Sequence, residues 1–233
     1  MEATAPEGPL VLVGHSMGGM TIMAVADQHP EIFGDRVIGV ALLSTSAGQL
    51  ANVGLGLPFL NNPLTRRIRP GLIGALGRQH ELVERARRIG SDVGFLATRR
   101  FSFGSSVPPA LVEFVAEMIS ATPIDVLAEF YATLDEHEKV EALGALNRGV
   151  EVLVLAGDTD RIVRPAHSQE IVRFVPGAES VVIADAGHMV MLEHPDEVNA
   201  ALRAFFDRVE RAASVPSVVG PEEDLDLDER ATA

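Results

Sequence analysis

One stretch of this sequence restricts the fold more than any other: Leu10 to Met20, which reads LVLVGHSMGGM. It begins with apolar residues that favour a β-strand, continues through a serine with a glycine two positions to either side, and passes directly into a helical pattern. A turn from a buried strand into a helix within so few residues strains the central residue and requires small neighbours, Gly14 and Gly18. The stretch therefore predicts a strand, a sharp turn with the Ser16 hydroxyl at its tip, and a helix. His15 is expected to point away from this hydroxyl and to have a packing role.

Short apolar runs predict the strands of a sheet. None of them alternates cleanly between apolar and polar residues, as expected for parallel strands that are buried on both faces. The runs lie at residues 9–14, 36–44, 150–157 and 180–185. Helical patterns separate them, and a last one begins at Pro195, a residue that suits the first turn of a helix. This order of strands and helices predicts an α/β fold with a mostly parallel sheet.

The connection between the second and third strands is too long for an ordinary crossover, since it runs from Ala47 to Asn147. Apolar residues at helical spacing within it predict an inserted helical cap over one end of the sheet. The end of the chain is strongly acidic and is expected to be disordered. These features divide the chain into core residues 1–46, a cap at 47–147, core residues 148–213, and a tail at 214–233.

Composition excludes several classes of protein. The sequence has no cysteine, which rules out disulfides and thiolate metal sites, and no metal or cofactor is predicted. A net charge of −14 makes nucleic acid an unexpected partner. The apolar runs are of strand length, so no transmembrane segment is expected. The first nine residues contain neither the basic nor the apolar region of an export signal, which predicts a cytoplasmic location.

Positive charge is concentrated between Arg66 and Arg100, where nine arginines stand against three acidic residues. One interpretation is a solvated helical face whose long arginine stems cover apolar surface. The other is a cationic rim that draws an anionic substrate or a lipid surface toward the site. The sequence leaves both interpretations open.

Two further polar groups follow predicted strands. Asp160 lies three residues after Gly157, which ends the third strand, and His188 precedes the last helix. The carboxyl ends of parallel strands meet at one edge of the sheet, so Ser16, Asp160 and His188 are expected to lie together. A serine hydroxyl needs an imidazole to accept its proton, and the imidazole needs a carboxylate to fix its tautomer. Asp158 lies on the same turn as Asp160 and is the alternative acid.

Three segments resemble the nucleophile turn, acid turn and histidine loop of the α/β-hydrolase superfamily, in its capped esterase and lipase-like branch: VLVGHSMGG, LVLAGDTDRIV and AGHMVMLEHPDEV. The resemblance covers the core outside the cap. It implies a serine hydrolase that cleaves a small-molecule carboxylic ester or thioester through an acyl-enzyme. Ser16 would be the nucleophile, His188 the general base and Asp160 the orienting acid, because the family spacing favours Asp160 over Asp158. The backbone N–H of Met17 would be one oxyanion donor.

This sequence also departs from the family pattern. In the family the nucleophile turn follows the fifth strand of an eight-stranded sheet, whereas here it follows the first predicted strand. We therefore expect the N-terminal strands to be lacking, together with the loop that supplies a second oxyanion donor. The first strand would then form an exposed edge that promotes self-association, and the chain alone would hydrolyse esters at least about 100-fold more slowly than a complete sheet. The alternative function is a non-catalytic ligand-binding module on a hydrolase scaffold.

Overall fold

Parallel strands form the sheet that the sequence predicts. The structure is a computed structural model, and it describes residues 5–48, 91–123 and 136–214 together with residues 126, 130, 133 and 134. Within these ranges the strand order is β1-β2-β3-β4, and every neighbouring pair is parallel. The strands are β1 (Leu10–His15), β2 (Val37–Leu43), β3 (Glu151–Gly157) and β4 (Glu179–Ile183).

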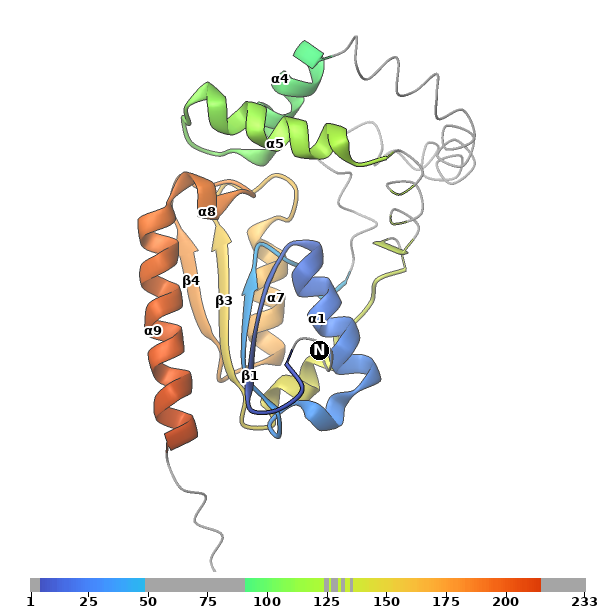
Figure 1. Cartoon of the computed structure of the whole chain (residues 1–233), viewed down its shortest axis with the longest axis vertical. Helices are drawn as coiled ribbons and strands as arrows, with labels where there is room; N and C mark the ends of the chain where they lie inside the picture. The colour runs from blue at the N-terminus through green and yellow to red at the C-terminus, as the bar shows by residue number, and fades with distance from the viewer. Residues whose placement is uncertain are drawn as a thin grey trace, which may run out of the picture.

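Helices cover both faces of this sheet (Figure 1). Several begin at a proline, whose fixed φ suits the first helical turn. The α-helices are α1 (Met17–Gln28), α4 (Ser91–Ser102), α5 (Pro109–Ala121), α7 (Pro165–Phe174), α8 (Val190–Glu193) and α9 (Pro195–Ser214). Two 3₁₀ helices, η1 (Pro30–Ile32) and η4 (Glu141–Asn147), complete the described elements. The predicted α/β fold is therefore confirmed.

The two faces of the sheet form two separate cores. On β2, Val40 and Leu42 point into a core that includes residues of α1, α7 and η4. Ala41 and Leu43, the alternate residues of the same strand, point into a second core against α9. Because side chains alternate across a strand, a strand buried on both faces must be apolar at every position. This explains the apolar runs of β2 and β3, whereas β1 and β4, at the edges of the described sheet, have exposed residues, contrary to the prediction that every strand is buried on both faces.

The edge strand β1 is covered on one face only. α9 packs over β2 and β3, and Figure 1 shows this helix on the side of the sheet opposite α1. Val11 and Val13 of β1 remain 37% and 48% exposed. Among the described residues β1 pairs only with β2. The described sheet thus ends in an apolar, half-covered strand.

Helices α4 and α5 of the predicted cap lie beyond the carboxyl ends of the strands (Figure 1). Phe103 and Val112 pack there against Met189 and Leu192, which follow His188 in the sequence. The predicted cap residues 49–90, most of the arginine-rich segment, and tail residues 215–233 lie outside the described residues.

The segment that returns from the cap to the sheet is η4. Its leucines, Leu143 and Leu146, are buried in the core that α1 shares with the sheet. We therefore propose that the core resumes at η4, earlier than the boundary at residue 147 that the sequence predicts. Among the described helices, none is both long enough and apolar enough to cross a membrane.

Candidate active site

The turn after β1 has the strained backbone that its sequence predicts. Ser16 adopts φ 52° and ψ −117°, a left-handed φ that is rare for a residue with a side chain. Its backbone N–H donates to the carbonyl oxygen of Leu43 at 2.9 Å, which ties the turn to the end of β2. Thr45, which follows β2, also stabilises the turn, because its hydroxyl donates to the Ser16 carbonyl oxygen at 2.7 Å.

The glycines of this turn differ in whether the structure has room for a side chain at their position. A Cβ on Gly14 would lie between 2.5 and 2.7 Å from backbone atoms of Gly18 and Gly19, so strand and helix approach closely only without it. A Cβ on Gly19 would lie 2.6 Å from the side chain of Thr45. Gly18 has open space where a Cβ would be. The prediction that Gly18 must be small was therefore wrong.

Alanine substitutions at Gly14 and Gly18 form a matched pair. Gly14→Ala is expected to lower the free energy of unfolding by about 2 kcal/mol or more, because backbone atoms must shift to admit the methyl group. Gly18→Ala should leave it unchanged or raise it by up to about 1 kcal/mol, since the position has room for a methyl group and alanine has a higher helix propensity than glycine. Urea unfolding of both variants measures the difference. Equal effects would contradict this account of the turn.

Ser16, His188 and Asp160 form a continuous hydrogen-bonded chain at the carboxyl ends of the strands. Nε2 of His188 lies 3.0 Å from Oγ of Ser16, and Nδ1 of His188 lies 2.9 Å from Oδ2 of Asp160. The histidine and the aspartate are only 6% and 3% exposed. A carboxylate accepts but does not donate, so Nδ1 carries the proton and Nε2 is free to accept one from the serine hydroxyl.

The carboxylate of the alternative acid, Asp158, has a different partner. Its carboxylate accepts from the backbone N–H of Ala186 at 3.4 Å. Asp160 instead presents Oδ2 to His188, while its Oδ1 accepts from the N–H groups of Ile162 and Val163 at 2.8 and 2.9 Å. Both oxygens are thus held, and the carboxylate faces the imidazole in one orientation.

Met17 is the first residue of α1, directly after Ser16. The first N–H groups of a helix have no partner within the helix, and the helix dipole places partial positive charge there. The N–H of Met17 can therefore donate to a developing oxyanion beside Ser16.

Among the described residues, no group of three or more His, Asp or Glu side chains is placed to hold a metal ion.

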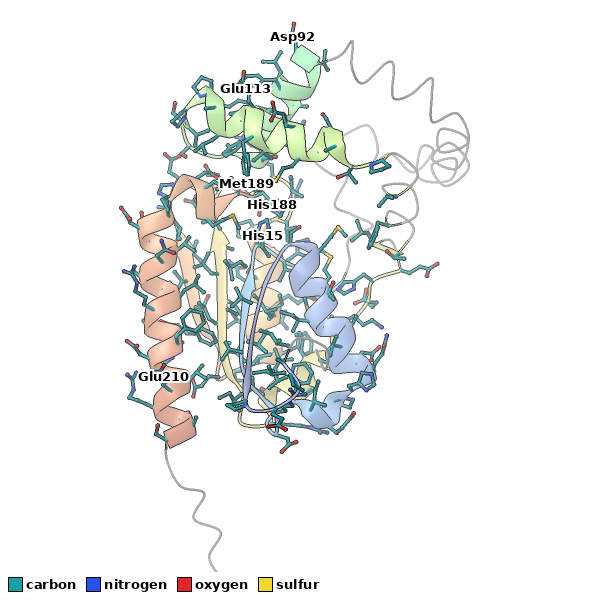
Figure 2. The ribbon with its side chains drawn as sticks, in the orientation of Figure 1. His15, Asp92, Glu113, His188, Met189 and Glu210 are labelled. Carbon is teal, nitrogen blue, oxygen red and sulfur yellow. The ribbon has the colours of Figure 1, made fainter. Side chains whose placement is uncertain are left out.

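His15 contacts His188, which the sequence reasoning missed. Its Nε2 lies 2.9 Å from the carbonyl oxygen of His188, and the two ring centres are 4.8 Å apart (Figure 2). The carbonyl can only accept, so Nε2 of His15 donates the hydrogen bond. Burial, followed by the neighbouring His188, lowers the pKa of His15 to about 4. The side chain is therefore neutral near pH 7 and supports the backbone of His188.

The lowered pKa of His15 predicts a loss of stability in acid. Between its ordinary pKa of 6.5 and about 4, the unfolded chain binds a proton at this position that the folded chain does not. Unfolding is therefore favoured as the pH falls, by up to about 3 kcal/mol at pH 4. His15→Gln keeps an N–H donor but does not titrate, so its unfolding free energy should fall less over this range. Chemical unfolding of both proteins at several pH values measures the difference, and parallel curves would contradict the prediction.

The chain matches a model of the alpha/beta hydrolase family over residues 2–201, and it belongs to this family. It is 28% identical over 223 residues to the polyketide synthase ThaQ of Burkholderia thailandensis, covering 91% of this chain and 9% of that protein. It is 42% identical over 69 residues to a pimeloyl-[acyl-carrier protein] methyl ester esterase of Stenotrophomonas maltophilia, covering 29% of this chain and 27% of that one.

A thermophilic esterase from Thermogutta terrifontis has a similar solved structure. The TM-score is 0.61 and the sequence identity 27%, over 87% of this chain and 66% of the esterase. The chain thus spans less than two thirds of the length of the two curated relatives and about two thirds of the esterase chain.

Proposed function

We propose that this chain is a serine hydrolase that cleaves a carboxylic ester or thioester through an acyl-enzyme intermediate. The observation that carries the proposal is the unbroken chain of hydrogen bonds from Ser16 through His188 to Asp160. The esterases among the similar proteins support ester bonds as the target.

The reaction follows from the roles of these groups. Oγ of Ser16 attacks the carbonyl carbon while Nε2 of His188 takes its proton, and Asp160 stabilises the resulting imidazolium. The N–H of Met17 donates to the oxyanion of the tetrahedral intermediate. His188 then gives the proton to the leaving alcohol or thiol. A water molecule, activated by the same histidine, releases the acid and restores the serine hydroxyl.

The substrate is expected to be a small ester, lipid-like or anionic. Of the arginine-rich segment, the structure describes Arg99 and Arg100 on α4, in the part of the cap that lies beyond the strand ends. We propose that they belong to a cationic rim that draws such a substrate toward the site. The cytoplasmic location stays a prediction from the sequence.

The test is hydrolysis of p-nitrophenyl esters of two to eight carbons, with the matched p-nitroanilides as controls. Saturable ester cleavage above the buffer rate is expected, together with much slower anilide cleavage, because an amine is a poorer leaving group than a phenol. A folded protein that does not exceed the buffer rate with any ester would contradict the proposal.

The exposed side of β1 supports a proposal about assembly. We propose that this strand pairs with a further strand from outside the described sheet, and that the chain expressed alone associates through it and hydrolyses esters slowly. Val13→Lys places a charge on the uncovered face, and charged residues on edge strands oppose such pairing. Light scattering during size-exclusion chromatography should show oligomers that this variant reduces. A monodisperse monomer with ordinary esterase turnover would contradict the proposal.

A further inference from the structure

The carboxylate of Glu193 lies between the histidine loop and the cap. Glu193 is the last residue of α8, the short helix that begins two residues after His188. Its Oε1 accepts from the backbone N–H of Gly187 at 2.7 Å. Its Oε2 accepts from the N–H of Gly104, the N–H of Ser105 and the Ser105 hydroxyl, each at 2.8 Å. One half-buried side chain thus joins the residue before His188 to the loop between α4 and α5.

The two loops touch closely at this point. A Cβ on Gly104 would lie 2.7 Å from the backbone nitrogen of Gly187, and a Cβ on Gly187 would lie 2.7 Å from the carbonyl carbon of Phe103. Side chains at the two glycines would push the loops apart. A further hydrogen bond joins the residue after His188 to the cap: the N–H of Met189 donates to the carbonyl oxygen of Ser102 at 2.9 Å. The backbone on both sides of His188 is therefore tied to the cap, as the positions of His188 and Met189 below α5 in Figure 2 illustrate.

From this arrangement we propose that Glu193 is a positioning residue: it sets the place of the His188 imidazole by clamping Gly187 to the Gly104–Ser105 segment of the cap. The inference rests on the proposed serine hydrolase function. All four partners are neutral donors, so the site requires an ionised acceptor with both oxygens available. A shift of about 1 Å in a catalytic group can lower a rate by about 100-fold. Glu193 touches no reacting atom and acts only through the loop that carries His188.

The substitution Glu193→Gln tests the clamp with little change of shape. A glutamine keeps one acceptor oxygen but places an NH₂ group against N–H donors, so one side of the clamp is lost. Glu197→Gln is the matched control, because Glu197 lies on the first turn of α9 with an exposed carboxylate beside His194. Ser105→Ala is a milder variant that removes only one of the four hydrogen bonds.

Each protein is titrated with a fluorophosphonate, and kcat and KM for a p-nitrophenyl ester are expressed per reactive site. For Glu193→Gln we expect a fall in kcat of about 10- to 100-fold, with KM changed by less than about threefold and labelling slowed in parallel. Ser105→Ala should change kcat in the same direction by a few-fold, and Glu197→Gln should match the wild type.

The outcomes separate the inference from the function on which it rests. A purely structural role would lower the thermal midpoint or the number of reactive sites but leave kcat per site unchanged, and that result overturns the inference alone. If Glu193→Gln does not fold, an unchanged kcat per site in Ser105→Ala overturns it. A folded wild type that the fluorophosphonate does not label overturns both the inference and the proposed function.

Discussion

Replacing Ser16 by alanine is expected to lower kcat for ester hydrolysis by about 10⁴- to 10⁶-fold. The hydroxyl lies 3.0 Å from Nε2 of His188, and the variant leaves the imidazole with nothing to activate. The fold should persist, because alanine keeps the Cβ and the backbone bond from residue 16 to Leu43 does not involve the side chain. Steady-state kinetics with a p-nitrophenyl ester, and circular dichroism to check folding, measure the effect.

Ser120→Ala is the control, since Ser120 is an exposed serine on α5. It should match the wild type. The same pair of variants separates an enzyme from a ligand-binding module, because a binding protein would keep its function in Ser16→Ala. Turnover within tenfold of the wild type in folded Ser16→Ala would exclude Ser16 as the nucleophile.

The second large effect is expected at Asp160. Asp160→Asn should lower kcat by about 10⁴-fold, because an amide NH₂ facing His188 favours the tautomer whose proton sits on Nε2. Such a ring cannot accept the serine proton. The other oxygen of residue 160 can still accept from Ile162 and Val163, so the turn should keep its shape.

Asp158→Asn is the matched control for Asp160→Asn. Asp158 lies on the same turn, but its carboxylate bonds to Ala186 and not to the imidazole. The control should retain activity within about tenfold of the wild type, well above Asp160→Asn. The reverse order of the two variants would assign the acid to Asp158.

The sequence allowed the sheet and the meeting of three side chains to be predicted. Strands buried on both faces must be apolar throughout, so β2 and β3 stand out as runs. Parallel strands bring their carboxyl ends to one edge of the sheet. The sequence alone therefore predicts that residues as distant in the chain as Ser16 and His188 lie close together. The need of a serine nucleophile for an imidazole and a carboxylate pointed to His188 and left Asp158 and Asp160 as candidate acids, between which the family resemblance favoured Asp160.

Contacts that depend on how loops pack were not predictable. The bond from His15 to His188 spans 173 positions, and that from Ser105 to Glu193 spans 88. No local pattern marks either of them, because each joins segments that are distant in the sequence and meet only in the folded protein. The same holds for Gly18 and Gly19: both fit a tight turn in sequence, and only the position of Thr45 shows which one must lack a side chain.

The most direct test of the account is to identify the residue that a fluorophosphonate modifies. The folded protein is treated with the probe, digested, and mapped by mass spectrometry, with His188→Ala treated in parallel. The account predicts one adduct per chain, on Ser16, and strongly slowed labelling in His188→Ala, because the hydroxyl reacts only when Nε2 accepts its proton. An adduct on another residue, or a folded wild type that carries none, would contradict the assignment of Ser16 as an activated nucleophile.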